Sequence, residues 1–190
     1  MVNNNIAITD LNEIIVNDRI LGISFKISEQ LIIIFNIYAP AQSEDRVPFL
    51  NNLPTLLNLH SLPPDAYIII CGDFNMIRNN DLDIISGHPH SNHEVKNFNS
   101  FIETNMLFDC FRKLFPFSRD FSWSRTVIEQ EGDPPTFSAS RLDYIFCNHS
   151  LIKTLNSCEM SHFSSTDHKL ISAYFKIDHF PRGPGRWQFN

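Results

Sequence analysis

Two apolar, mostly β-branched runs predict the central strands of a sheet. Residues 31–38 and 67–71 are bounded by turn residues, as is typical of strands buried on both faces. Between them, apolar residues recur at helical spacing from Phe49 to Leu57. Pro48 suits the first turn of such a helix, and Pro54 should kink or split it. The order strand, helix, strand indicates an α/β protein.

The period of the pattern changes further along the chain. Residues 95–102 carry apolar side chains at helical spacing and predict a second amphipathic helix. Residues 121–124, 142–147 and 171–177 alternate or are strand-like, which predicts antiparallel strands with one covered face. Residues 5–27 offer two or three weaker strands. The whole predicts an α/β sandwich, followed at residues 179–190 by a Pro- and Gly-containing linker.

Composition and charge narrow the classes of protein. A chain of 190 residues with 43% hydrophobic residues is expected to form one ordinary domain. A net charge of −6 argues against a general basic surface that coats nucleic acid. A metal-dependent nuclease stays possible, because carboxylates that hold a cation are counted as bare negative charge.

Localisation and redox state follow from what the sequence does not show. The cysteines have no close paired spacing, so we expect free thiols rather than disulfides or a zinc site; they are Cys71, Cys110, Cys147 and Cys158. The polar start of the chain and the lack of a long apolar run predict a soluble intracellular protein without membrane association.

The first candidate site residues follow the second predicted central strand. Asp73 and Asn75 come directly after Gly72, where open α/β sheets place their ligands. Asp73 could orient or deprotonate water, and Asn75 could donate hydrogen bonds to a charged oxygen. The alternative is an Asx turn without chemistry, which is common after strands. The two residues alone do not decide between these readings.

A second group lies in the carboxyl-terminal half of the chain. Asp143 falls in a predicted strand, where a carboxylate is costly unless it is paired or binds a cation. His168 could be its partner, since a carboxylate can hold an imidazole in one tautomer. Asp167 could bind a hard cation through oxygen. The alternative is a polar turn that leads into the last strand.

Three histidines within six residues raise the possibility of a zinc site. They are His88, His90 and His93. No cysteine or carboxylate completes a recognisable ligand spacing around them. We therefore expect a polar loop.

Four segments in order resemble the motif series of the exonuclease III-like nucleases, within the endonuclease/exonuclease/phosphatase family. They are residues 36–40 (NIYAP), 72–75 (GDFN), 140–146 (SRLDYIF) and 165–168 (STDH). The sequence is more closely similar to the endonuclease domain of non-LTR (LINE-type) retrotransposons. Residues 121–124 (FSWS) and the tail at residues 182–190 support that closer resemblance, which runs from about Ile20 to the end of the chain.

The resemblance implies a fold and a reaction. The fold would be a four-layer α/β sandwich with two central sheets flanked by helices over residues 1–178, and residues 179–190 would lead to a reverse transcriptase. The activity would be hydrolysis of a DNA phosphodiester that leaves a 3′-hydroxyl, with one or two Mg²⁺ or Mn²⁺ ions. Partners would be DNA and no membrane, and the location would be the nucleus. Oligomeric state is not indicated.

The resemblance also implies a role for each candidate residue. Tyr38 would contact the scissile phosphate, Asp73 would activate water, and Asn75 would stabilise the transition state. Asp143 would orient His168, which contacts the substrate together with Tyr38 and Asn75. Asp167 would help to bind the metal ion.

The sequence departs from the family pattern at two places. The early strands that carry a metal-binding Asn and Glu in the family have no counterpart, and Ala41 stands where an Asn is common. We therefore expect a domain that lacks its first strands, with weak or absent activity. The rival readings are a catalytically dead nucleic-acid-binding or interaction module, and a phosphatase of the same fold that acts on lipids.

Overall fold

The main sheet of the protein has six strands. In the computed structural model, which describes residues 8–86, 90–127, 135–162 and 166–177, its strand order is β1-β2-β3-β4-β9-β6. These strands are β1 (Ile8–Asn17), β2 (Ile20–Ile27), β3 (Gln30–Tyr38), β4 (Tyr67–Asp73), β9 (Asp143–Asn148) and β6 (Leu107–Asp109). Strands β3 and β4 pair in parallel, and the other neighbours are antiparallel.

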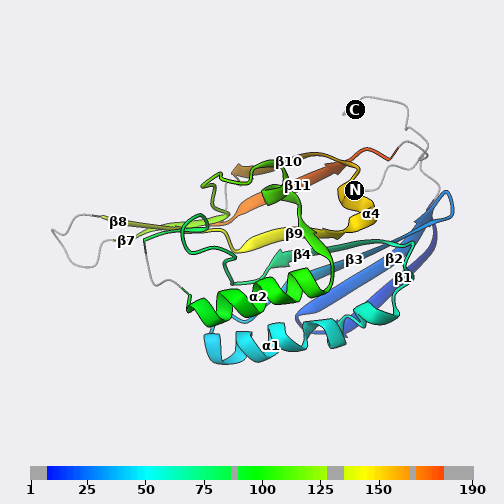
Figure 1. The fold of residues 1–190 in the computed structure, drawn as a ribbon, viewed down its shortest axis with the longest axis horizontal. Helices are drawn as coiled ribbons and strands as arrows, with labels where there is room; N and C mark the ends of the chain where they lie inside the picture. The colour runs from blue at the N-terminus through cyan, green and yellow to red at the C-terminus, as the bar shows by residue number, and fades with distance from the viewer. Residues whose placement is uncertain (1–7, 87–89, 128–134, 163–165, 178–190) are drawn as a thin grey trace.

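Two helices cover one face of this sheet. Helices α1 (Ser43–Leu56) and α2 (Asn92–Thr104) lie side by side beneath it (Figure 1). The core between the helices and the sheet is rich in aromatic side chains. The centre of the Phe74 ring lies 5.5 Å from the centre of the Phe98 ring and 5.3 Å from that of the Phe146 ring. The many Phe residues of the sequence thus help to fill the contact between two layers.

The opposite face carries a smaller sheet over part of its width. Strands β10 (Leu155–His162) and β11 (Lys169–Phe175) pair antiparallel, and β11 packs against β9. A second hydrophobic cluster lies there, to which the short helices α3 (Cys110–Leu114) and α4 (His149–Ile152) contribute. A third sheet projects beyond the end of the main sheet (Figure 1). Its strands, in order across the sheet, are β5 (Ile84–Ile85), β8 (Thr136–Ser140) and β7 (Trp123–Val127). A single turn of 3₁₀ helix, η1 (Leu59–Ser61), precedes β4.

The structure confirms the predicted α/β class, with several sheets flanked by helices. The two predicted central strands are β3 and β4, although Asn36 and Tyr38 on one face of β3 are exposed. The prediction for the first helix was wrong in its start: α1 begins at Ser43 and continues through Pro48 and Pro54 without a break. Leu50 and Leu53 of this helix are buried in the core, and their burial offsets the hydrogen bonds that proline removes.

The remaining predictions that the fold can test concern cysteine and membrane insertion. All four cysteines are free, as predicted, but the fold brings Cys110 and Cys147 to an Sγ–Sγ distance of 3.6 Å. Within the described part of the chain, no helix combines the length and apolar character needed to cross a bilayer. The predicted linker at residues 179–190 lies outside the described residues.

Helix α2 begins with a capping box that also ties it to α1. The Ser91 hydroxyl accepts a hydrogen bond from the Glu94 amide, and the Glu94 carboxylate accepts one from the Ser91 amide. Ser43 and Arg46 of α1 donate to the same carboxylate. The hydrogen bond from Ser43, followed by those from Ser91 and Arg46, lowers the pKa of Glu94 to about 2, although burial acts in the opposite direction.

This contact predicts a pH-dependent contribution to stability. A carboxyl group with a lowered folded-state pKa stabilises above its unfolded value of 4.5, and the benefit is lost as pH falls toward 2. Glu94→Gln is expected to lower the free energy of unfolding by about 1–2 kcal/mol at pH 7. Urea unfolding at pH 7, 5 and 3.5 should show this difference shrinking at the lowest pH. Exposed Glu103 of the same helix is the control, and an equal loss in Glu103→Gln would contradict the assignment.

Candidate active site

The register of three strands places polar residues in one row at one end of the main sheet. Tyr38 of β3 pairs with Asp73 of β4, and Asp73 pairs with Asp143 of β9. Both β3 and β4 end at this row, where the loops that follow them begin. Residues far apart in the sequence therefore meet at one edge of the sheet.

Gly72 allows β4 to approach β3 directly before Asp73. Its φ angle is +124°, a region that side chains disfavour. A Cβ atom at this position would lie 2.0 Å from the Ile37 carbonyl oxygen. Only glycine fits here, and Asp73 is thereby held close to the end of β3.

Asn75 forms an Asx turn around the Asp73 carboxylate. The Asn75 amide donates to Asp73 Oδ1 at 2.8 Å, and its backbone has a left-handed φ of +48°. The Asn75 side chain donates to the Ala39 carbonyl at 2.9 Å and to Asp73 Oδ2 at 3.2 Å. The turn and the predicted site are thus the same feature. Both side-chain hydrogens of Asn75 are used within the protein, so contact with a phosphate requires one of them to change partner.

Asp143 and His168 form a hydrogen-bonded pair. His168 Nδ1 donates to Asp143 Oδ2 at 2.8 Å, which leaves Nε2 for another partner. The hydrogen bond to Asp143 raises the pKa of His168, with smaller contributions from the charges of Asp73 and Asp167. Among the described residues, Asp73, Asp143 and His168 bring ligand atoms within 4.8 Å of one another. Burial raises the pKa of Asp73, which makes it a better proton acceptor than an ordinary aspartate.

Asp167 and Tyr38 lie at the margin of this group. The exposed Asp167 carboxylate accepts a hydrogen bond from the Trp123 indole at 2.8 Å, which lowers the pKa of Asp167. Tyr38 is 57% exposed, and the Arg19 guanidinium lies 5.6 Å from the centre of its ring. Sequence patterns did not single out Arg19 or Trp123 as site residues.

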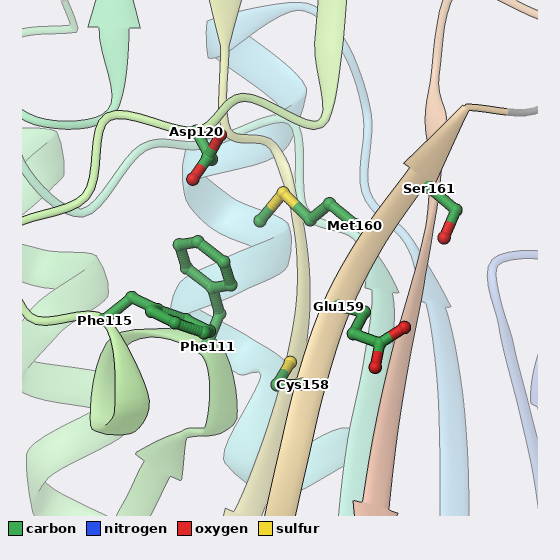
Figure 2. A pocket seen from close by; sticks show the side chains of 7 residues that line it. All are labelled: Phe111, Phe115, Asp120, Cys158, Glu159, Met160 and Ser161. Carbon is green, nitrogen blue, oxygen red and sulfur yellow. The ribbon is translucent and has the colours of Figure 1, made fainter.

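A groove of about 270 Å³ adjoins the paired carboxylates. It lies between the face of the main sheet and β11, and its lining includes Asn36, Cys71, Asp143 and Lys169. Another hollow, of about 320 Å³, lies between α3 and β10 and contains none of the candidate residues (Figure 2). Phe111 and Met160 line that second hollow together with Asp120 and Glu159, and no histidine is among the described residues of its lining.

Among the described residues, the histidine-rich segment contributes none to the group of Asp73, Asp143 and His168. His88 lies outside the described residues, and His90 Nδ1 lies 3.3 Å from Nη2 of Arg46. Burial lowers the pKa of His90, and the Arg46 charge lowers it further. A guanidinium so close to the imidazole disfavours a bound cation. The expectation of a polar loop stays a prediction.

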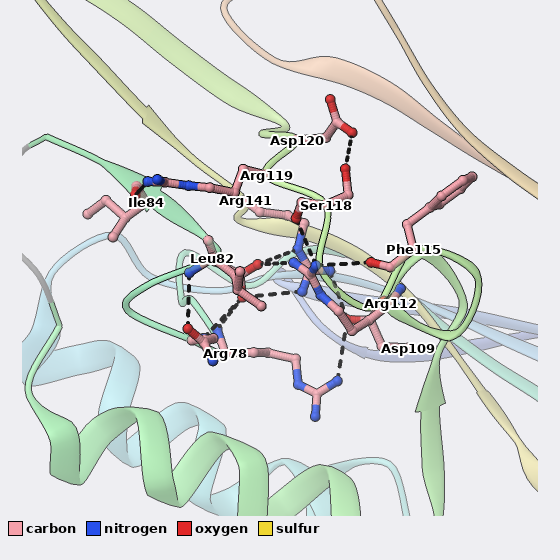
Figure 3. Close-up of polar contacts among 12 residues, drawn as sticks. Arg78, Leu82, Ile84, Asp109, Arg112, Phe115, Ser118, Arg119, Asp120 and Arg141 are labelled. Carbon is pink, nitrogen blue, oxygen red and sulfur yellow. Dashed lines mark hydrogen bonds and ion pairs between the residues drawn. The ribbon is translucent and has the colours of Figure 1, made fainter.

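A buried ionic network supports the segment that carries Asp143. Arg141 is fully buried, and it donates to Asp83 at 2.8 and 3.2 Å and to Asp109 at 2.8 Å. Arg78 and Arg112 contact the same two carboxylates, as Figure 3 shows. The Arg141 amide donates to the Asp83 carbonyl as well. The sequence pattern noted Arg141 within its motif but gave no sign of Asp83 or Asp109, which occupy loop and strand-end positions.

Comparison with known proteins identifies the family. A profile of the Endonuclease/Exonuclease/phosphatase family matches residues 15–168, and the chain belongs to this family. Its members are phosphodiester hydrolases that act as nucleases or phosphatases. No curated protein matches the sequence of this chain.

Solved structures show the same fold at low sequence identity. An AP endonuclease from Archaeoglobus fulgidus has a TM-score of 0.68 and 19% identity, over 90% of this chain and 72% of that one. A 3′ phosphatase from Neisseria bound to product DNA hairpin has a TM-score of 0.64 and 17% sequence identity, over 90% of this chain and 72% of that one. The endonuclease domain of TRAS1, a telomere-specific non-LTR retrotransposon, has a TM-score of 0.63 and 12% sequence identity, over 88% of this chain and 70% of that one. The chain spans 55% of the length of an AP endonuclease from Leishmania major and 55% of the Xenopus laevis APE2 catalytic domain.

The donor set at the site fits a hard divalent cation. Asp73, Asp143 and Asp167 supply carboxylate oxygens, which Mg²⁺ and Mn²⁺ prefer. Asp143 Oδ2 is committed to His168, whereas the Asp167 carboxylate is exposed and has Oδ1 free of the Trp123 contact. Asp167 therefore fits the metal-binding role that the sequence predicted for it. That role stays a prediction.

Proposed function

We propose that this protein is a divalent-metal-dependent DNA endonuclease of the retrotransposon type, which hydrolyses a phosphodiester and leaves a 3′-hydroxyl. The observation that carries the proposal is the group of Asp73, Asp143 and His168, whose ligand atoms lie within 4.8 Å at one end of the main sheet. A general base, an imidazole with a fixed tautomer and a carboxylate partner are the parts that such hydrolysis needs.

Each side chain has a step in the proposed reaction. Asp73, with its raised pKa, accepts a proton from the attacking water. Asp143 holds His168 through Nδ1, so that the protonated ring can offer Nε2–H to a phosphoryl oxygen. Mg²⁺ or Mn²⁺ held by Asp167 would neutralise charge on the phosphate when bound. Exposed Tyr38 lies in register with Asp73 and offers its hydroxyl to the substrate backbone.

The choice of DNA and of the retrotransposon type rests on similarity. The motif series and the FSWS segment resemble the endonuclease domains of LINE-type elements, and the TRAS1 domain shares the fold. The AP endonuclease and the DNA-bound 3′ phosphatase of the same fold are named for acting on DNA. The negative net charge of −6 makes a bound cation important for holding a phosphate backbone at this site.

A nicking assay tests the proposal. Supercoiled plasmid should be converted to the open-circular form in Mg²⁺ or Mn²⁺ and not in EDTA, and a polymerase should extend the new 3′ end. His168→Ala is expected to reduce the nicking rate by about 10²-fold or more, the usual contribution of a positioned acid or charge-stabilising group. The exposed His162 of β10 provides a control, since His162→Ala should nick as the parent does.

Two outcomes would reject the proposal. Metal-independent DNA binding without any cleavage would indicate a binding module. Release of phosphate from a phosphoinositide at a rate well above plasmid nicking would indicate a lipid phosphatase instead.

A further inference from the structure

The segment that leads into β7 contacts both halves of the active site. Ser122 is completely buried, and its hydroxyl oxygen accepts hydrogen bonds from the amides of Leu142 at 2.9 Å and Asp143 at 3.0 Å. One side-chain atom therefore fixes the backbone at the start of β9, where Asp143 emerges. Leaving these two partly buried donors without an acceptor would cost free energy, so the loop cannot easily shift away.

The same few residues hold the segment that carries His168. The Ser122 carbonyl accepts a hydrogen bond from the Lys169 amide at 2.6 Å, and Trp123 forms an antiparallel bridge with His168. The Ser124 amide donates to the Asp167 carbonyl at 3.1 Å. Residues 122–124 thus pair with the backbone of Asp167, His168 and Lys169 as a short strand would.

Trp123 adds a contact to the Asp167 side chain. Its indole Nε1 donates to Asp167 Oδ2 at 2.8 Å. This hydrogen bond occupies one oxygen of the carboxylate and leaves Oδ1 directed to other partners, such as the Thr166 hydroxyl at 3.5 Å. Groups that hydrogen-bond a metal-binding carboxylate in this way fix its orientation and support its affinity for the ion.

The segments that carry Asp143 and His168 need a contact between their backbones, because they belong to different sheets. Asp143 lies on β9 of the main sheet, whereas His168 precedes β11 of the two-stranded sheet. A hydrogen bond of 2.8 Å joins the Asp143 carboxylate directly to the His168 ring. A side-chain contact alone does not fix two backbones. Ser122 binds both backbones, since its hydroxyl accepts from the Asp143 amide and its carbonyl accepts from the Lys169 amide, and the adjacent Trp123 pairs with His168.

We propose that Ser122 and Trp123 are positioning residues of the active site: Ser122 sets Asp143 against His168, and Trp123 orients Asp167 for the cation. The proposal rests on the proposed function for its effect on cleavage. A small displacement of reacting groups lowers the rate strongly, because positioning supplies much of the rate enhancement in phosphoryl chemistry. The two residues should therefore affect different kinetic parameters.

Kinetics on the full chain separates the two roles. Ser122→Ala should lower kcat by about 10–100-fold with the KM for DNA unchanged, and Ser122→Thr, which keeps the hydroxyl, should restore most of the rate. Trp123→Phe should raise the Mg²⁺ concentration for half-maximal activity by about 10-fold, with nearly parental kcat at saturating Mg²⁺. Thr126→Ala, at an exposed position of β7, is the matched control and should match the parent. Parental kcat in Ser122→Ala, or parental Mg²⁺ dependence in Trp123→Phe, would overturn the proposal.

A spectroscopic measurement does not depend on cleavage. The indole N–H resonance of Trp123, assigned with the Trp123→Phe variant, should shift in Asp167→Asn and on titration with Mg²⁺. If the parent cuts no DNA and this resonance still responds, the proposed function fails and the positioning role of Trp123 stands. A Trp123 resonance that is unchanged in Asp167→Asn would reject that positioning role whatever the activity.

Discussion

Replacing Asp73 by Asn is expected to lower the nicking rate by about 10³-fold, within the range that a general base contributes. Asparagine has the same shape, and its oxygen can still accept the Asn75 amide hydrogen bond that closes the Asx turn. The proton acceptor is lost, and the turn is kept. Single-turnover nicking at saturating Mg²⁺ measures the chemical step separately from DNA binding. The DNA affinity of the variant should therefore remain close to that of the parent.

A matched control lies at the other end of the same strand. Asp65 is exposed and precedes β4, whereas Asp73 ends it, so Asp65→Asn makes the same chemical change away from the site. This variant should nick at the parental rate. If Asp73→Asn retains more than about a tenth of the activity, the general-base assignment is wrong, because a base contributes at least about 10²-fold.

Replacing Arg141 by Met is expected to lower the free energy of unfolding by about 3–5 kcal/mol, the typical cost of removing one partner from a buried ion pair. The variant leaves Asp83 and Asp109 in a site where both carboxylates are almost fully buried. Methionine has a similar length but no donors, so it cannot satisfy either group. Urea denaturation followed by circular dichroism measures the loss.

Lysine should not rescue this position. Arg141 contacts Asp83 through two nitrogens and Asp109 through a third, and its guanidinium lies 4.4 Å from the centre of the Tyr144 ring. A single ammonium cannot reproduce this planar geometry. Exposed Arg125 of β7 is the control, and Arg125→Met should change stability by no more than about 0.5 kcal/mol. A loss below about 1 kcal/mol in Arg141→Met would show that the network does not support the fold.

The sequence predicted those parts of the fold that a local pattern encodes. The apolar runs at residues 31–38 and 67–71 lie in strands β3 and β4, and residues 95–102, with apolar side chains at helical spacing, lie in helix α2. Strand β10 was not predicted: its polar and apolar residues do not alternate cleanly, and it acquires its place by pairing with β11. The sequence misplaces the start of α1, because Pro48 is typical of a first helical turn, whereas burial of Leu50 and Leu53 keeps the helix continuous around it.

For the candidate site, residue type and order along the chain were enough to select Asp73, Asn75, Asp143, Asp167 and His168. Each is a polar residue at the end of an apolar strand or beside one, and for Asp143 within its predicted strand burial of a carboxylate needs a partner. Sequence alone could not show which of them meet, because contact between Asp73 and Asp143 depends on the antiparallel register of β4 and β9. It also left open whether Asn75 forms a turn or a site; the structure shows the turn, and the role of Asn75 in a site stays a prediction.

What the sequence determined by itself was therefore the family, the α/β class and the chemical types at the site, since these depend on side chains and their order. The tertiary structure alone decided how the parts are held. Ser122 has no recognisable pattern in the sequence, yet its hydroxyl binds the backbone before Asp143 and its carbonyl binds the backbone after His168. Such a role depends on distances between segments 20 to 47 residues apart, and only the folded chain brings them within hydrogen-bonding distance.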